Sequence, residues 1–457
     1  MMSDPVQHIP PEIINFFREN VGEILLVKGP PGSGKTMFSL ECMKSLCREK
    51  RGITIFPRMD ADQLNSEYSW LMDDRADHNL LPFHGNTKMA DPNWFKREFE
   101  YLNSKGEGKI GFMLFDPINA ITEQYENPER KMKEIVSLVQ SSNVSAIVVQ
   151  EKEDTTYLDH LAGGVVRLYF DEREGRRFRA LRFEKLRGVE VKNSNYLFTL
   201  HSGFFRAFHP WSVDTVRKGD WVPIEDSETH FSTGLEDLDR ILGGGFKRGS
   251  YNILDVDDNI LSSEYLLLLR PVLLNFLHHD QGVIMITPAG EHPESIRNDL
   301  GTYIDIERIS DKLYFLDYFT ATSRKEYIIP MSSTTRREGA QQKGMEVIQR
   351  LRGRENKPYL DFVGLDTLEY LIGESLTLRR LLTGVSQSKV TKTLGIGLAK
   401  PGLKIGQGIR NMSDVYIRMV KIHSIPCFFG VKPETSLYAI LPSERDGFPN
   451  LELVPLT

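Results

Sequence analysis

The segment Gly29-Pro30-Pro31-Gly32-Ser33-Gly34-Lys35-Thr36 decides the fold. It follows the apolar run Ile24-Leu25-Leu26-Val27, which is typical of a short buried parallel strand. It precedes residues 37–48, in which apolar side chains recur at helical spacing. A strand, a glycine-rich loop and a helix in this order form the context that a Walker A motif, or P-loop, requires. The sequence therefore predicts a loop that binds nucleotide phosphates.

The residue types in this loop match the chemistry of a bound triphosphate. Glycines allow backbone N–H groups to turn toward the phosphates, and the following helix adds the positive end of its dipole. Lys35 is expected to reach the β- and γ-phosphates, and the Thr36 hydroxyl is expected to hold Mg²⁺. The alternative is a glycine-rich turn that binds nothing, and the complete motif in its complete context disfavours it. We therefore expect ATP and Mg²⁺ as cofactors.

Two later strands end in polar residues that belong beside such a loop. The apolar run from Gly111 ends in Asp116, the Walker B pattern, in which a buried strand delivers a carboxylate to the metal. Many strands end in aspartate, so this pattern gains its weight from the Walker A motif. The run at 144–149 ends at Gln150. This amide could sense the γ-phosphate or could lie on the surface, and the sequence leaves both open.

Length and composition limit the class of protein. A chain of 457 residues predicts two or three domains. The three cysteines lack metal-ligand spacing, which argues against both zinc and a disulfide framework and favours a reducing cytoplasm. No apolar run approaches the ~20 residues of a membrane span, and the N-terminus shows no secretion signal. The net charge of -6 provides no overall attraction to nucleic acid.

An arginine-rich segment follows Gly163, where the apolar period changes to two and predicts antiparallel strands. A solvated strand face is the default interpretation for most of these basic residues. Lys185 and Arg187 differ because they lie together in the run Glu184-Lys185-Leu186-Arg187-Gly188. For these two, an alternative is that they point at a neighbouring subunit.

The second half of the chain repeats the first. Residues 211–230 have mixed charge and no clear period, which predicts a linker between domains at 1–210 and 231–457. A strand, a helix and a later strand ending near Asp366 then follow in the earlier order, which indicates two copies of one domain. The segment 256–263 replaces the P-loop but lacks its lysine and glycines, so the second nucleotide site is predicted to be degenerate. The predicted fold class is α/β, with two tandem domains that each contain a mainly parallel sheet and flanking helices.

These motifs together resemble a known superfamily. The Walker A unit, residues 112–116, Glu184–Gly188 and the leucine–aspartate–triple-glycine stretch at 234–249 resemble the RecA superfamily, in particular its KaiC and RadA branch. Residues 9–17, Arg176–Gly188 and the ending 431–457 resemble archaeal gas-vesicle regulators of the GvpD type. The resemblance implies a RecA-type fold in each half.

The resemblance also implies how such a protein works. It implies a ring of identical subunits that share nucleotides, in which Lys185 and Arg187 reach the γ-phosphate of the neighbour. GvpD-type proteins are implied to be cytosolic repressors that act on an activator protein without a direct need for DNA. A negative net charge is consistent with a protein partner.

One departure from the KaiC pattern concerns hydrolysis. KaiC-type ATPases place glutamates just after the second strand to orient water, and the matching positions here are Arg58 and Met59. Asp60 and Glu67 are the nearest carboxylates along the chain, and they are the candidate catalytic groups together with Lys35 and Gln150. This departure predicts firm binding of ATP and slow hydrolysis.

Three functions fit the sequence. The leading hypothesis is a regulator whose ATP state controls a protein partner, for example in transcription. The first alternative is an active ATPase of the RecA/RadA class that works on DNA, for which rapid, DNA-stimulated turnover would be the sign. The second is a structural role for ATP between subunits, which predicts nucleotide that cannot exchange.

Overall fold

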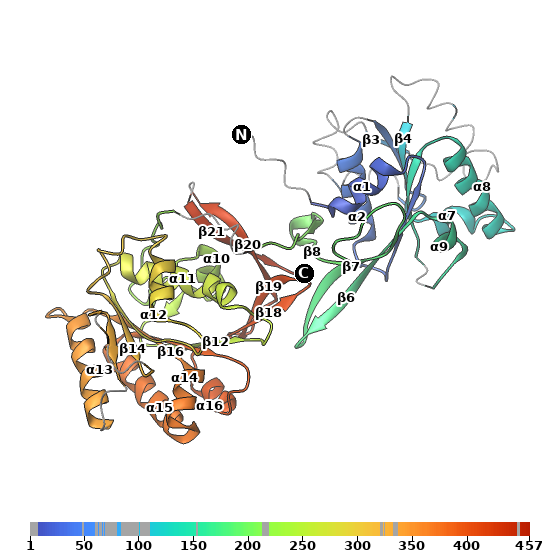
Figure 1. The fold of residues 1–457 in the computed structure, drawn as a ribbon. Helices are drawn as coiled ribbons and strands as arrows, with labels where there is room; N and C mark the ends of the chain where they lie inside the picture. The colour runs from blue at the N-terminus through green and yellow to red at the C-terminus, as the bar shows by residue number, and fades with distance from the viewer. Residues whose placement is uncertain are drawn as a thin grey trace. The chain divides into compact units, whose positions relative to one another are not determined.

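The structure is a computed structural model that describes residues 8–47, 50–59, 63, 66, 68, 80–83, 100, 110–151, 154–212, 219–319, 323, 325–331, 337–445 and 448–457. The chain forms two compact units, Met1–His209 with Leu456–Thr457, and Pro210–Pro455. Each unit contains its own sheet with flanking helices (Figure 1). Asp60 and Glu67 lie outside the described residues.

The first unit contains a nine-stranded sheet in the order β3-β2-β4-β5-β1-β6-β7-β8-β9. The strands from β3 through β6 pair in parallel, and β7, β8 and β9 extend the sheet antiparallel beyond β6. The strands are β1 Ile24–Lys28, β2 Arg51–Ile55, β3 Leu80–Phe83, β4 Ile110–Phe115, β5 Ser145–Val149, β6 Gly164–Arg173, β7 Arg176–Leu186, β8 Asn195–Thr199 and β9 Arg206–Ala207.

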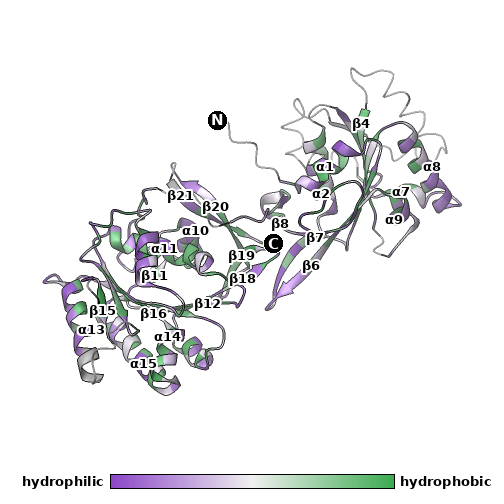
Figure 2. Ribbon diagram, viewed as in Figure 1, coloured by the Kyte–Doolittle hydropathy of each residue, from purple (hydrophilic) through white to green (hydrophobic). Residues whose placement is uncertain are grey.

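Helices cover both faces of this sheet, so its central strands are apolar on both sides. All five residues of β1 and of β5 are buried, as expected for strands in the middle of a parallel sheet. One apolar cluster joins the strands to α1 (Pro11–Glu19) and α2 (Lys35–Leu46). A second joins the opposite face to α7 (Ile118–Thr122), α8 (Pro128–Ser141) and α9 (Tyr157–Leu161). Figure 2 shows hydrophobic colour around β4, hydrophilic colour toward the end of β6, and both colours on α8.

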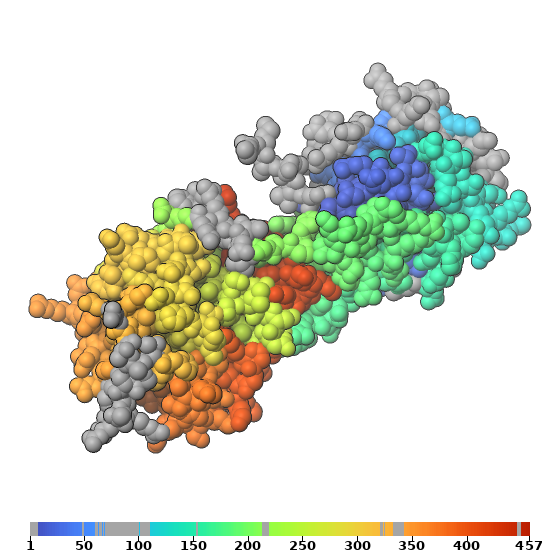
Figure 3. All heavy atoms as spheres, in the orientation of Figure 1, coloured from blue at the N-terminus to red at the C-terminus, as the bar shows by residue number. Residues whose placement is uncertain are grey.

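The second unit contains a ten-stranded sheet in the order β15-β14-β13-β16-β17-β12-β18-β19-β20-β21. The strands are β12 Tyr251–Val256, β13 Gly282–Ile286, β14 Leu313–Asp317, β15 Ile328–Pro330, β16 Tyr359–Gly364, β17 Leu394–Ala399, β18 Val415–Ile422, β19 Ile425–Lys432, β20 Tyr438–Arg445 and β21 Phe448–Pro455. Its main helices are α11 Ser262–His278, α12 Pro293–Leu300, α13 Arg337–Arg352, α14 Leu365–Ile372, α15 Glu374–Thr391 and α16 Gly406–Met412. In the space-filling view, α13 and α15 form an outer surface of this unit in orange (Figure 3).

The two sheets share one strand order. Reading each sheet from its parallel edge, β3-β2-β4-β5-β1-β6 in the first unit matches β14-β13-β16-β17-β12-β18 in the second. The antiparallel extensions β7-β8-β9 and β19-β20-β21 also match, and β15 is an additional edge strand. This confirms the predicted fold class of two tandem, mainly parallel α/β domains.

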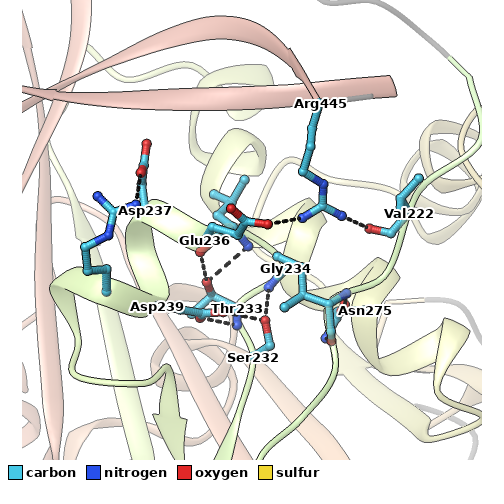
Figure 4. Close-up of polar contacts among 12 residues, drawn as sticks. Val222, Ser232, Thr233, Gly234, Glu236, Asp237, Asp239, Asn275 and Arg445 are labelled. Carbon is cyan, nitrogen blue, oxygen red and sulfur yellow. Dashed lines mark hydrogen bonds and ion pairs between the residues drawn. The ribbon is translucent and has the colours of Figure 1, made fainter. Parts of the chain in front are cut away.

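The leucine–aspartate–triple-glycine stretch is a structural element of the second unit (Figure 4). The carboxylate of Asp239, in α10 (Glu236–Ile241), accepts hydrogen bonds from the Ser232 hydroxyl at 2.5 Å and from the Thr233 N–H at 2.7 Å. The Gly244 N–H donates to the Asp239 carbonyl at 2.7 Å. Gly245 has φ +98°, and a Cβ there would lie 2.3 Å from the Phe231 carbonyl oxygen. This part of the motif therefore fixes a turn before β12.

The described end of the predicted linker packs on the second unit. The Trp221 N–H donates to the Tyr303 carbonyl at 3.0 Å, and Trp221 is 8% exposed. The Asn275 side chain exchanges hydrogen bonds with both backbone groups of Ile224. Within the part of the chain that the structure describes, no helix is long and apolar enough to cross a membrane.

Candidate nucleotide site

The P-loop begins directly after β1, at the carboxyl edge of the sheet, and its last two residues, Lys35 and Thr36, open α2. Its backbone has a conformation that glycine adopts readily, since Gly29, Gly32 and Gly34 have φ of +149°, +75° and +96°. Added Cβ atoms would lie 2.3 Å from the Leu168 carbonyl oxygen at Gly29 and 2.9 Å from Leu200 Cδ1 at Gly34. The strand–loop–helix geometry that the sequence predicted is therefore present.

Lys35 lies over the loop that it follows. Its ammonium donates hydrogen bonds to the Gly29 carbonyl at 2.7 Å and to the Pro30 carbonyl at 2.9 Å. Ser33 is fully buried, and its hydroxyl has no hydrogen-bond partner among the described residues. The N-terminus of α2 and the Lys35 ammonium together form an anion site of the kind that holds phosphates.

Asp116 follows β4 directly and is 6% exposed. Burial raises the pKa of its carboxyl to about 6, while a hydrogen bond from Thr36 and the charges of Lys35 and Arg58 oppose the rise. Its Oδ2 atom is buried and has no hydrogen-bond partner among the described residues. Buried polar atoms are normally paired, so an orphaned carboxylate oxygen beside Thr36 fits a cation. The structure thus brings together the two predicted metal-binding residues.

Gln150 follows β5 directly and is 1% exposed, so the surface-amide interpretation does not describe it. Its backbone N–H donates to the carbonyl of Val27, in the strand that leads into the P-loop, at 2.9 Å. Its Oε1 accepts a hydrogen bond from the Thr156 hydroxyl at 3.2 Å. Its role toward the γ-phosphate remains a prediction.

A buried ion pair beside the P-loop was not predicted from the sequence. Lys28 is fully buried, and its ammonium contacts the Asp159 carboxylate at 2.9 Å and the Asp154 carbonyl at 2.7 Å. Burial opposes ionisation of Asp159, but hydrogen bonds from Lys28 and Thr156 hold the pKa of its carboxyl below the usual range. The Thr156-x-x-Asp159 spacing is a readable capping box at the start of α9. Besides this capping box, the lysine at the end of the apolar run of β1 was a second feature of the sequence that could have indicated the ion pair.

Lys185 and Arg187 contact the end of α9 in their own unit. The Lys185 ammonium donates to the Asp159 carbonyl at 3.0 Å and to the Ala162 carbonyl at 2.6 Å. Arg187 donates to the His160 carbonyl at 3.4 Å. Burial and the neighbouring Arg187 lower the pKa of Lys185. Cations are favourable at a helix C-terminus, so these contacts are stable in a single chain, and their predicted reach to a neighbour remains a prediction.

Arg179, from the arginine-rich strand β7, contacts the P-loop directly. Its guanidinium donates to the Gly32 carbonyl at 2.9 Å. It also lies 4.7 Å from the ring centre of Phe170, which Arg177 approaches to 3.4 Å. Burial and the adjacent Arg177 lower the pKa of Arg179. The default of a solvated strand face therefore does not describe this arginine.

Glu151 was also missed by the sequence reasoning. Its carboxylate forms a two-point ion pair with Arg58, at 2.5 Å from Nη1 and 3.1 Å from Nη2. Arg58 occupies one of the positions where the KaiC pattern has a glutamate, and the carboxylate that pairs with it lies two residues beyond the end of β5. The negative charge of Glu151 contributes to the raised pKa of Asp116.

The counterpart site in the second unit is filled by internal ion pairs. Arg418, on β18, donates to Asp257 at 2.6 Å in the loop that replaces the P-loop. Lys400 follows β17, and its ammonium lies 3.7 Å from Asp366. Asp366 is the second residue of α14, two residues beyond the end of β16. Among the residues that the structure describes, no group of three or more His, Cys, Asp or Glu could hold a metal ion by itself.

A P-loop at the carboxyl edge of a parallel sheet, with a buried aspartate after a nearby strand, defines a RecA-like P-loop nucleotide-binding protein. Comparison with known families gives the particular group. Residues 13–184 match the family described as GvpD gas vesicle protein, P-loop domain, and residues 220–453 match GvpD basic region 2. The chain belongs to the GvpD family.

Individual relatives agree with this assignment. Protein GvpD2 of Halobacterium salinarum is 25% identical over 99% of this chain and 97% of its own length. Protein GvpD1 of the same organism is 30% identical over 65% of this chain and 59% of its own length. The circadian clock oscillator protein KaiC of Parathermosynechococcus lividus is 24% identical over 50% of this chain and 45% of its own length. The predicted resemblance to GvpD-type proteins and to KaiC is confirmed.

Proposed function

We propose that this chain is an ATP- and Mg²⁺-binding switch that regulates a protein partner in gas vesicle formation, including at the level of transcription. The observation that carries the proposal is the complete P-loop beside Asp116, whose buried Oδ2 atom has no hydrogen-bond partner among the described residues. The family match to GvpD, described as a gas vesicle protein, supports the biological setting.

The residues of the site divide the work of holding the nucleotide. Lys35 and the N-terminus of α2 neutralise the phosphates, and Lys35 exchanges its contacts with two loop carbonyls for contacts with anionic phosphate oxygens. Thr36 and Asp116 hold Mg²⁺, which neutralises charge on the β- and γ-phosphates when bound. Gln150, buried at the end of β5, senses the γ-phosphate through its amide.

Slow hydrolysis makes the bound nucleotide a signal. Arg58 and Met59 follow β2, where the KaiC pattern has glutamates, and loss of general-base help typically removes ~10²–10⁴ in rate. Asp60 and Glu67 remain candidates for this role from the sequence, outside the described residues. A long-lived ATP state suits a protein that must hold one conformation while it engages a partner.

Assembly and partner choice follow from charge. The net charge of -6 favours a protein partner over nucleic acid.

In a homo-oligomer, Lys185 and Arg187 leave the carbonyls of α9 and contact the γ-phosphate bound by the neighbouring subunit. Alanine at both positions should preserve ATP binding and remove nucleotide-dependent assembly, as measured by light scattering. A wild-type protein that stays monomeric with ATP at every concentration would rule out this role.

The proposal is tested by affinity capture from the native host with immobilised chain. We expect a protein partner that is retained with ATP and lost without nucleotide, and lost with the Lys35→Ala chain in both conditions. Identical captured proteins with and without ATP would contradict the switch. Rapid, DNA-stimulated turnover would favour the RecA/RadA alternative, and nucleotide that cannot exchange would favour a purely structural role.

A further inference from the structure

The ion pair between Arg58 and Glu151 spans the metal edge of the site. Arg58 follows β2 and Glu151 follows β5, and these strands lie on either side of β4 in the sheet. Asp116 follows β4 itself. The pair therefore crosses over the carboxyl end of the strand that carries the candidate metal ligand.

The backbone at Gln150 and Glu151 is held by hydrogen bonds to β1 and to α7. Glu151 follows the buried Gln150, whose N–H is bound to the P-loop strand. The Glu151 N–H donates to Asn119 Oδ1 at 3.3 Å, and Asn119 is 5% exposed in α7, just after Asp116. The Glu151 side chain is 45% exposed and is therefore open to water. A side chain can position a water molecule when its backbone is held in place and its carboxylate is accessible to water.

We propose that Glu151 is the carboxylate that orients the attacking water in ATP hydrolysis, and that Arg58 is a latch that keeps it inactive. This inference rests on the proposed function, because it needs ATP in the P-loop. Asp116 is buried and would hold the metal, whereas Glu151 lies at the same edge with a partly exposed side chain.

The reaction step uses only water and ATP. The water oxygen forms a bond to the γ-phosphorus while the bond from that phosphorus to the β–γ bridging oxygen breaks. Glu151 accepts a hydrogen bond from the water, takes its proton and releases it to solvent. The products are ADP, phosphate and one proton, and no oxidation or reduction occurs.

The latch follows from the two-point geometry. Both Glu151 oxygens are engaged by the two terminal nitrogens of Arg58, so the pair fixes the direction in which the carboxylate faces. The pair is also exposed, with Arg58 at 53%, and an exposed pair contributes little stability. Arg58 can therefore be withdrawn without disturbing the fold, and withdrawal activates Glu151.

The test is ATP turnover by the purified full-length chain and three variants, with Mg-ATP binding measured for each. We expect Arg58→Gln to raise turnover at least about tenfold and Glu151→Gln to lower it at least about tenfold. The double variant should match Glu151→Gln, because the latch has no effect without the group it holds. A matched control is the exposed pair Arg130–Glu134 on α8, 3.2 Å apart, where Arg130→Gln and Glu134→Gln should leave turnover unchanged.

Two results would overturn the inference while leaving the switch proposal intact: ATP binding retained with turnover unaffected by Glu151→Gln, or turnover lowered by Arg58→Gln. A wild-type chain that binds no Mg-ATP would overturn both the switch proposal and the role of Glu151. The binding measurement detects that result independently of the turnover measurement.

Discussion

The two units have the same sheet order but opposite chemistry at the edge where a nucleotide would bind. In the first, Asp116 is buried with an oxygen that has no hydrogen-bond partner among the described residues. In the second, both oxygens of Asp366 accept backbone hydrogen bonds, from Ala289 at 3.0 Å and from Thr367 at 2.9 Å, and Lys400 lies nearby. Lys400 thus neutralises the charge of Asp366 in the second unit, whereas a metal ion would neutralise the charge of Asp116 in the first.

The neighbouring strands show the same contrast. Arg167 on β6 and Arg418 on β18 occupy equivalent positions, opposite Lys28 and Asp255. Arg167 pairs with Glu184 on β7, whereas Arg418 pairs with Asp257 inside the replacement loop. The comparison teaches that this architecture tolerates loss of its ligand when internal charges replace it, because the apolar faces of the sheet hold the fold.

The buried ion pair beside the P-loop should give the largest stability effect. Asp159→Asn leaves the fully buried Lys28 ammonium without its counter-charge, and breaking such a pair costs about 3–5 kcal/mol. Urea unfolding followed by hydrogen exchange in β1 measures the first unit by itself. Glu134→Gln, which breaks an exposed pair on α8, is the control and should leave that unit unchanged. Equal effects of the two variants would contradict the buried-pair account.

Asp116 should make the first unit less stable as pH rises, in the absence of metal. Burial raises its folded pKa from 3.8 to about 6, so the folded state binds more protons than the unfolded state between these values. Stability then falls from pH 4 through pH 6, and Asp116→Asn should stabilise the metal-free unit at pH 8 by up to about 3 kcal/mol. The gain should vanish below about pH 4.

The equivalent change in the second unit sharpens this contrast. Asp366→Asn removes charge from a carboxylate that is already paired, so it should not stabilise the second unit at any pH. Thermal unfolding of both variants across pH 4–8 makes the comparison. Stabilisation by Asp366→Asn equal to that by Asp116→Asn would contradict the difference between the two sites.

The replacement loop should show a smaller effect, confined to one of its two aspartates. Asp257 is 9% exposed and bound to Arg418, so Asp257→Asn should cost about 1.5–3 kcal/mol through the lost charge-assisted hydrogen bond. Asp258 is exposed, and Asp258→Asn should leave stability unaltered. Urea unfolding of the second unit separates them. A loss of unfolding free energy for Asp258→Asn as large as that for Asp257→Asn would contradict this account. It would mean that a carboxylate before the helix stabilises the unit through its charge, without a direct contact.

Local patterns predicted much of this structure. The P-loop, Thr36, Asp116 and the tandem repeat depend on neighbouring residues in the chain and on regular strand order, which a single sequence displays. Gln150 was placed at the end of its strand, although its burial could not be read from the sequence.

The missed contacts join residues far apart in the chain. Lys28 meets Asp159 across 131 positions, and Arg58 meets Glu151 across 93. No periodicity marks such pairs, because the sheet order and not the local sequence brings them together. Lys185 and Arg187 were singled out for a reach to a neighbouring subunit, which stays a prediction, and only the fold shows that both contact α9 within one chain.

The central claim, one working site and one filled site, is tested most directly by calorimetric titration of the full-length chain with Mg-ATP. The account predicts one nucleotide per chain. It also predicts that Lys35→Ala weakens binding roughly tenfold to a hundredfold. Alanine at Ser262, the first residue of α11 as Lys35 is of α2, should leave binding unchanged. Two nucleotides per chain, or an affinity that Lys35→Ala does not alter, would contradict the account.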